Sequence, residues 1–208
     1  MEKKLTIIIP VYNEEKTLLE LLKKVNFLKT DHGAEIILIN DGSEDSSKNI
    51  IEKNENFYDH FISYEKNKGK GFAVREGIKK SKGEYIIFQD ADLEYDPKDI
   101  VKFLEMINKF APDVVLGSRF NYDKYSKSHS ILNKIGNLIL TSTFNILYNT
   151  TFTDIYSCYL CVKKKYINEN LLKANGFDQQ AEILTQAVKN GKNFFEVPIN
   201  YNGRSIED

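Results

Sequence analysis

Short apolar segments alternate along the chain with segments in which hydrophobic residues recur at helical spacing. Strands are expected at 5–10, 35–40, 61–64, 85–89 and 114–117, and helices at 14–28, 71–81 and 97–110. In the first helix, Leu18, Leu22 and Val25 form one stripe. Strands that alternate with helices pair in parallel, in a sheet covered on both faces. The pattern therefore predicts an α/β fold over residues 1–208, a single domain with a mostly parallel, Rossmann-like sheet flanked by helices.

Length and charge narrow the function. The chain has 208 residues and a formal net charge of -1, so it has no general attraction to nucleic acid, and any phosphate binding must be local. No apolar run approaches the length that spans a bilayer, and Met1 to Lys4 lead into the first strand without a cleavage-site signature. We expect a cytoplasmic protein that is neither secreted nor membrane-spanning.

Two cysteines, Cys158 and Cys161, form a C-x-x-C spacing that could indicate a redox pair or half of a zinc site. There is no second cysteine pair, and the three histidines are scattered. Cys158, Leu160 and Val162 alternate as in a strand, where residues three apart point to opposite faces. We predict two buried, reduced thiols.

Polar residues gather after three of the predicted strands, at 10–14, 40–43 and 90–92. In open α/β sheets, ligands bind outside the carboxyl ends of the strands. Any one of these clusters could be a helix cap. Three polar clusters at equivalent strand ends together predict a binding site at that edge of the sheet.

Asp90-Ala91-Asp92 is the most specific of these clusters. Two carboxylates directly after a buried strand repel each other unless a cation offsets them. Mg²⁺ or Mn²⁺ prefers oxygen ligands and binds through one or two carboxylates plus substrate phosphates. A bare D-x-D is an acidic turn in most proteins, but its place after a strand favours a metal site at Asp92 and Asp90.

Five motifs occur in order along the chain: Ile7-Ile8-Ile9-Pro10-Val11-Tyr12-Asn13-Glu14, Asn40-Asp41-Gly42-Ser43, Asn67-Lys68-Gly69-Lys70-Gly71, Asp90-Ala91-Asp92 and Gly117-Ser118-Arg119. Together they resemble family 2 glycosyltransferases, which implies a GT-A fold. The resemblance is strongest to the branch that charges polyprenyl phosphates, such as dolichyl-phosphate mannosyltransferases, and it includes 195–199 and Arg204. It implies a metal-dependent, inverting transfer of a hexose from a UDP- or GDP-linked sugar.

The resemblance also implies residue roles on the nucleotide side, within residues 1–120. Pro10 and Tyr12 would lie at the nucleotide, where Tyr12 would stack on the nucleobase unless its ring belongs to the core, and Glu14 would contact the nucleoside. Asp41 would accept a hydrogen bond from the base edge, which suits a carboxylate. Lys70 would approach the nucleotide, with Asp90 at the ribose or the metal and Asp92 on the metal.

On the acceptor side, within residues 121–208, the resemblance and the residues leave alternatives open. Arg119 and Arg204 are expected at the acceptor, and a guanidinium suits a phosphate, although Arg119 could form a structural ion pair. The amphipathic segment 130–148 could rest on a membrane surface or pack on the sheet. A saccharide acceptor, as in cell-surface polysaccharide synthesis, would need a general base, for which Glu182 is the candidate. A phosphate acceptor would not.

Asp154 lies in a segment, 154–159, where the chain lacks a glycine that is expected in that branch, so the family's role for this residue is not carried over.

Two other classes of protein share part of this pattern with the transferases. A dinucleotide-dependent oxidoreductase should carry G-x-G-x-x-G after the first strand, but 10–14 has no glycine. A non-catalytic protein that binds nucleotide sugars would share every binding residue. Turnover of the donor distinguishes it from an enzyme, and the oligomeric state is left open.

Overall fold

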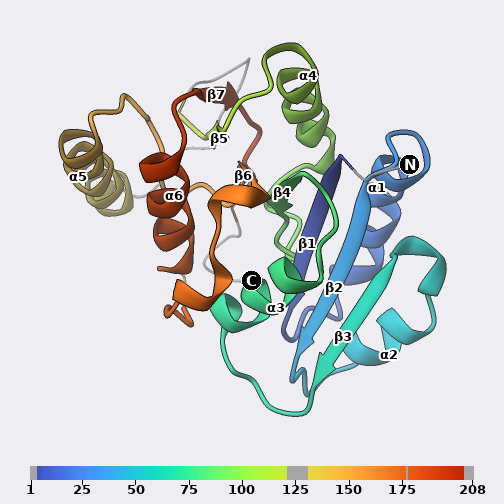
Figure 1. The fold of residues 1–208 in the computed structure, drawn as a ribbon. Helices are drawn as coiled ribbons and strands as arrows, with labels where there is room; N and C mark the ends of the chain where they lie inside the picture. The colour runs from blue at the N-terminus through green and yellow to red at the C-terminus, as the bar shows by residue number, and fades with distance from the viewer. Residues whose placement is uncertain (1–3, 121–130, 177, 204–208) are drawn as a thin grey trace.

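A computed structural model describes residues 4–120, 131–176 and 178–203, with the side chains of 131–133 left out (Figure 1). The strands are β1 (Leu5–Val11), β2 (Glu35–Asp41), β3 (His60–Tyr64), β4 (Tyr85–Phe88), β5 (Val114–Ser118), β6 (Leu160–Lys163) and β7 (Phe194–Pro198). The α-helices are α1 (Leu18–Thr30), α2 (Ser47–Glu52), α3 (Lys70–Lys80), α4 (Ile100–Phe110), α5 (Ile131–Tyr148) and α6 (Gln179–Asn190). Two of the 3-10 helices that matter below are η2 (Pro97–Asp99) and η4 (Glu169–Leu171).

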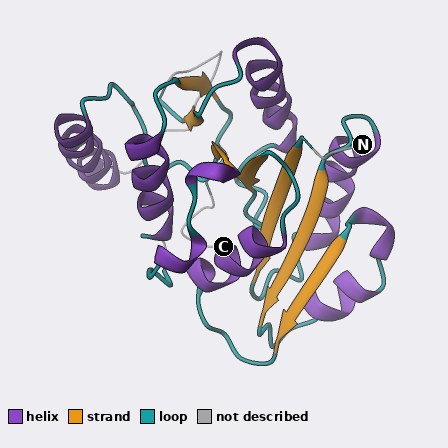
Figure 2. Cartoon of the chain, viewed as in Figure 1, coloured by secondary structure: helices purple, strands orange, loops and turns teal. Residues whose placement is uncertain are grey.

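The strands form one seven-stranded sheet in the order β3-β2-β1-β4-β6-β5-β7. Every pairing is parallel except those of β6, which runs antiparallel to both β4 and β5. The helices α3 and α6 lie in front of the sheet in Figure 1, and α1 lies behind it (Figure 2 shows the same view by element type). This mixed α/β architecture confirms the predicted mostly parallel fold.

The core consists of the central strands and the helix faces packed on them. Ile7, Ile8 and Ile9 of β1 are fully buried, because helices cover both faces of the sheet. Gly77 lets α3 approach closely, since a Cβ there would lie 2.6 Å from Cγ2 of Ile8. The close fit fixes α3, and with it the loop that precedes the helix.

The register of the sheet brings the predicted polar clusters together. Val11 of β1 pairs with Asn40 of β2, so Tyr12, which follows β1, and Asp41, the last residue of β2, lie side by side at this edge of the sheet. β4 lies on the other side of β1, and its carboxyl end leads into Asp90. The three clusters therefore share one edge of the sheet, as parallel pairing requires.

Several predicted boundaries were wrong for local reasons. The first helix begins at Leu18 rather than at residue 14, because the Glu14 carbonyl accepts hydrogen bonds from the Thr17 and Leu18 backbones and closes a turn first. The helix predicted at 97–110 starts as η2, whose N-cap Asp96 accepts a hydrogen bond from the Lys98 backbone. The residues of β7 and α6 were not predicted as a strand and a helix, whereas the strand-like alternation of Cys158, Leu160 and Val162 overlaps β6.

Both cysteines are free and buried, as predicted. Cys161 lies inside β6, whereas Cys158 precedes it. Burial raises the pKa of the Cys161 thiol well above its ordinary value. In the described part of the chain, no helix is both long and apolar enough to cross a bilayer.

Candidate functional site

A cavity of about 370 Å³ opens at the carboxyl ends of β1, β2 and β4. Its lining residues are Pro10, Val11, Tyr12, Glu14, Asp41, Asn67, Gly69, Lys70, Ala73, Asp90, Ala91, Asp92, Asn175 and Gly176. The structure thus gathers every residue that the sequence placed on the nucleotide side. Asn67, Asn175 and Gly176 were not among the predicted site residues.

Asp41 is fixed at one side of the cavity. Its carboxylate is only 2% exposed, and it accepts hydrogen bonds from the backbone N–H groups of Lys68 at 3.0 Å and Gly69 at 2.8 Å. Gly69 has φ 98°, a conformation that side chains disfavour. Asp41 therefore holds the loop that leads into α3 while its own position at the end of β2 is fixed by the sheet.

Tyr12 differs from the buried tyrosines of the core because its side chain is 45% exposed. The residue after it, Asn13, has φ 54°, and its side chain accepts a hydrogen bond from the Glu44 backbone at 2.8 Å. The Ser43 hydroxyl accepts one from the Asn13 backbone at 3.1 Å. These bonds tie the loop after β1 to the loop after β2 and leave an aromatic ring at the cavity wall.

Lys70 and Asp90 form an ion pair at the cavity wall, with Nζ 2.5 Å from Oδ1. Burial alone would lower the pKa of the Lys70 ammonium, but the negative charge of Asp90 more than offsets it, and the pKa is raised above its ordinary value. Lys70 is the first residue of α3, so it is positioned by the same loop that Asp41 holds. The positively charged ammonium of Lys70 is therefore fixed at the cavity wall.

Asp92 lies in a strained loop on the same side. Its Oδ1 accepts a hydrogen bond from the Glu94 backbone at 3.0 Å. Between them, Leu93 has φ 64°, a left-handed conformation that costs a non-glycine residue about 1–2 kcal/mol. Such strain often persists where it positions a functional group, here the Asp92 carboxylate.

The carboxylates at the cavity suit a divalent cation whose remaining ligands come from a bound molecule. Asp90 and Asp92 supply hard oxygen atoms on one cavity wall. Over the residues that the structure describes, no group of three or more His, Cys, Asp or Glu side chains could enclose an ion. Two carboxylates plus phosphate oxygens are what Mg²⁺ ordinarily uses, so the residues fit an ion that arrives with a phosphorylated ligand.

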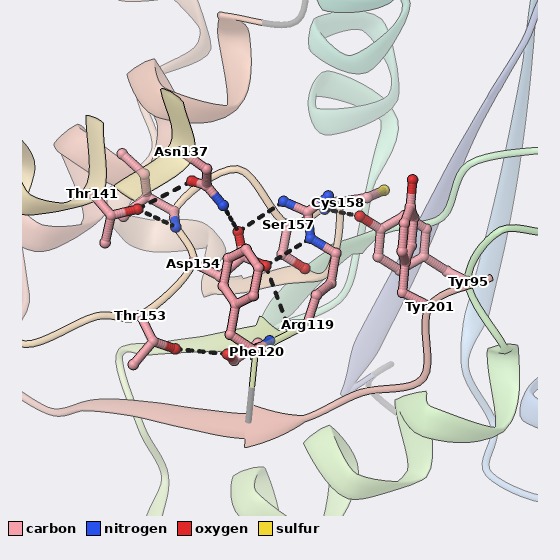
Figure 3. A network of polar contacts seen from close by, with 12 residues as sticks. Tyr95, Arg119, Phe120, Asn137, Thr141, Thr153, Asp154, Ser157, Cys158 and Tyr201 are labelled. Carbon is pink, nitrogen blue, oxygen red and sulfur yellow. Dashed lines mark hydrogen bonds and ion pairs between the residues drawn. The ribbon is translucent and has the colours of Figure 1, made fainter. Parts of the chain in front are cut away.

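Arg119 lies at the end of β5 and is engaged by a buried carboxylate (Figure 3). Asp154, with 0% exposure, accepts from Nε at 2.7 Å and Nη2 at 2.8 Å, and from the Arg119 backbone at 3.1 Å. Asn137 of α5 donates to the same carboxylate at 2.7 Å. Burial alone would lower the pKa of Arg119, but the hydrogen bond to Asp154 more than offsets it and the pKa is raised.

An aromatic ring covers the other side of this guanidinium. The Tyr201 ring lies 5.2 Å from Cζ of Arg119, and the Tyr201 hydroxyl donates to Glu94 at 2.8 Å. The Asn202 backbone also donates to the Glu94 carbonyl. Arg119 is therefore joined both to α5 and to the loop that carries Asp92, and the ion pair anticipated as its structural role is present.

Glu182, another predicted site residue, is not in the cavity lining. Glu182 lies on α6, where its carboxylate accepts hydrogen bonds from the backbones of Lys173 and Ala174 at 3.0 Å each. Arg204 lies outside the described residues. No pattern in the sequence indicated that the segment before α6 would reach the cavity, because 172–176 is irregular and has no periodicity.

The chain is similar in sequence to a known protein family and to proteins of two archaea. Residues 6–170 match the sequence profile of "Glycosyl transferase family 2". The chain is 32% identical over 218 residues to the UDP-N-acetylglucosamine–dolichyl-phosphate N-acetylglucosaminyltransferase of Methanococcus voltae, covering 95% of this chain and 85% of that protein. It is 29% identical over 211 residues to an uncharacterized protein of Methanocaldococcus jannaschii, covering 96% of this chain and 89% of that protein.

Two solved structures share the fold. The Mycobacterium tuberculosis glucosyl-3-phosphoglycerate synthase, in complex with Mn²⁺, UDP-glucose and phosphoglyceric acid, aligns with a TM-score of 0.75 at 14% identity, over 99% of this chain and 74% of that one. Staphylococcus aureus TarS with UDP-GlcNAc aligns with a TM-score of 0.65 at 19% identity, over 97% of this chain and 60% of that one. At these identities the likeness shows the fold, and it confirms the GT-A prediction.

Proposed function

Because the chain belongs to glycosyl transferase family 2, a family of transferases that use nucleotide sugars, we propose that it moves a hexose from a UDP- or GDP-linked donor to a polyprenyl phosphate. The observation that carries the proposal is the cavity at the carboxyl ends of β1, β2 and β4. It combines an exposed aromatic ring, a fixed carboxylate, a fixed ammonium and a pair of aspartates. Those are the groups that a base, a ribose and a diphosphate require.

The donor lies along the cavity in this proposal. Tyr12 offers a π-face for the base, and stacking on an aromatic ring tolerates different bases. Asp41 accepts from the base edge next to it, and Glu14 contacts the nucleoside. Lys70 and Asp90 lie at the diphosphate end, where the ammonium offsets phosphate charge.

Asp92, with Asp90 beside it, would hold a Mg²⁺ or Mn²⁺ ion against the diphosphate. Such an ion, when bound, would supply Lewis-acid stabilisation of the charge on the leaving diphosphate. The presence of Mn²⁺ with a nucleotide sugar in the synthase of the same fold supports this assignment. The strained Leu93 and the Glu94 backbone hold the Asp92 carboxylate in place.

The acceptor assignment rests on two observations. The M. voltae relative is named for a dolichyl phosphate acceptor. On this chain, α5 leaves large apolar side chains in solvent, namely Ile135, Leu138, Ile139, Leu140, Ile146 and Leu147. The sequence from 119 to 148 contains four lysine and arginine residues and one aspartate. Exposed apolar side chains on a helix, in a stretch of sequence with more basic than acidic residues, suit the surface of an anionic membrane, where a lipid acceptor resides.

The chemistry of a phosphate acceptor needs no general base from the protein. A phosphate monoester has a second pKa of about 6 and is mostly dianionic at neutral pH. Its oxygen attacks the anomeric carbon while the nucleoside diphosphate leaves, which inverts the configuration. Arg119, whose guanidinium is aimed by Asp154 and Tyr201, is the proposed ligand of the acceptor phosphate.

The acceptor assay gives the purified protein a labelled sugar nucleotide, a divalent cation, and either a short polyprenyl phosphate or a panel of free saccharides. Label should enter the lipid phosphate. Label that enters saccharides alone would overturn the acceptor assignment and keep the transferase. Donor binding without any turnover would identify a non-catalytic nucleotide-sugar-binding protein.

A further inference from the structure

The segment 172–176, between η4 and α6, forms a wall of the donor cavity that the sequence did not predict. Asn175 and Gly176 line the cavity together with Gly69 and Lys70. The segment has no regular secondary structure of its own. Its position therefore depends on the side chains that hold it.

Arg75 of α3 holds the segment from one side. Its Nη1 donates to the carbonyl oxygens of Leu172 at 3.2 Å and Ala174 at 3.1 Å, and its Nη2 donates to Oδ1 of Asn175 at 2.8 Å. One guanidinium thus engages three acceptors within four residues. The planar arrangement of its donors suits this better than a lysine would.

Glu182 of α6 holds the same segment from the other side. Its carboxylate accepts from the Lys173 backbone at 3.1 and 3.0 Å and from the Ala174 backbone at 3.0 Å. Carboxylate bonds to backbone N–H groups are charge-assisted and strong. The segment is therefore bound through its carbonyls by a cation and through its N–H groups by an anion.

The start of α3 is shaped to receive this segment. The Gly71 backbone donates to the Asn175 carbonyl at 2.8 Å. A Cβ on Gly71 would lie 2.3 Å from the Ala174 carbonyl oxygen, and one on Gly69 would lie 2.4 Å from the Asn175 carbonyl oxygen. Both glycines thus admit a backbone that any side chain would exclude, directly beside Lys70.

We propose that Arg75 and Glu182 are positioning residues that fix 172–176 as the cavity wall next to the donor's diphosphate and sugar. This deepens the proposed function and rests on it. The wall lies against Gly69 and Lys70, and because Lys70 pairs with Asp90, the proposal assigns the wall to the diphosphate end of the donor. Glu182 then acts through the wall and is not a general base.

The test compares Arg75→Ala, Arg75→Lys and Glu182→Gln with matched controls. Lys80→Ala removes a positive charge from an exposed position of the same α3, and Glu105→Gln makes the same change as Glu182→Gln at an exposed position of α4. Arg75 and Glu182 together are called the clamp. Asn175→Ala removes one exposed side chain of the wall and tests the same contact if a variant of the clamp does not fold. For each variant we measure calorimetric affinity for a nucleotide sugar and for the matching nucleoside monophosphate, and kcat and KM of transfer across pH.

Loss of the clamp should raise the dissociation constant and KM for the nucleotide sugar about tenfold, which one or two lost contacts would produce. Affinity for the monophosphate should change less than about threefold, because the base end is held separately. Glu182→Gln should keep kcat within a few-fold and keep the acid limb of the pH profile. Arg75→Lys should restore nucleotide-sugar binding only in part, and Asn175→Ala should weaken that binding as loss of Arg75 does.

The proposal is overturned if the clamp variants bind the nucleotide sugar as the controls do. It is also overturned if Glu182→Gln lowers kcat more than it raises KM and removes the acid limb, as loss of a general base would. Failure of the proposed function gives a different result, because then wild type itself would bind no nucleotide sugar.

Discussion

The buried ion pair between Arg119 and Asp154 makes a quantitative prediction about stability. Asp154→Asn keeps the size of the side chain but removes the charge, and either orientation of its amide turns an N–H₂ group toward a guanidinium N–H. Arg119→Met removes the guanidinium and leaves a carboxylate of 0% exposure with only neutral donors. Each single variant thus leaves one buried charge without its partner.

The magnitudes follow from that geometry. Removing one member of a buried pair costs about 3–5 kcal/mol, and the 17% exposure of the Arg119 side chain favours the lower end. The double variant leaves no buried charge and only an imperfectly paired amide, which costs roughly 1–3 kcal/mol. The two substitutions should therefore be coupled by at least about 2 kcal/mol rather than additive.

Urea unfolding of wild type, both single variants and the double variant measures this coupling, provided that the m-value stays constant. Donor affinity should be unchanged in Asp154→Asn, whereas turnover that depends on the acceptor should fall because the guanidinium is no longer aimed. Additivity within about 0.5 kcal/mol, or a single-variant cost below about 1 kcal/mol, would refute the reasoning.

Three further predictions test the cavity and the acid response. Tyr12→Ala should weaken nucleotide binding by roughly 1–3 kcal/mol in calorimetry, and an unchanged dissociation constant would mean that the ring does not stack. Gly69→Ala should raise KM for the donor, because φ is 98° and a Cβ would lie 2.4 Å from the Asn175 carbonyl; wild-type KM would contradict the close packing. Asp113 accepts from the Lys192 and Asn193 backbones, from Lys163 and from Tyr166. Burial alone would raise its pKa, but these bonds outweigh burial and lower the pKa from 3.8 to about 2. A depressed carboxyl pKa stabilises the fold above its unfolded pKa, so about 1–2 kcal/mol should be lost as pH falls from about 4 to about 2. Asp113→Asn should lack that loss in acid titrations of stability, and an unchanged pH dependence would contradict the assignment.

The sequence predicted the parts of the fold that depend on local patterns. The strands β1 to β5 coincide with the apolar segments of the sequence, and the parallel pairing that this pattern predicts puts Tyr12, Asp41 and Asp90 at one edge of the sheet. The position of β6 could not be predicted this way. Its antiparallel insertion between β4 and β5 depends on where the chain returns after α5, which no local pattern specifies.

Site residues that belong to sequence motifs were predicted, whereas those that reach the cavity through tertiary contacts were not. Lys70 and Asp92 belong to recognisable motifs, whereas the segment of Asn175 is held at the cavity by contacts such as the hydrogen bond from Arg75, 100 residues earlier in the chain. For Arg119, sequence reasoning left an acceptor ligand and an ion pair open. The structure shows the pair with Asp154, and the acceptor role stays a prediction.

The most direct test of the account is a calorimetric titration of the protein with UDP- and GDP-linked sugars, with and without Mn²⁺. We predict saturable binding of at least one nucleotide sugar, and this binding should require the ion and be lost in Asp92→Asn. Circular dichroism should show that the variant is folded. Binding of no nucleotide sugar, or binding that is the same without the ion and in Asp92→Asn, would contradict it.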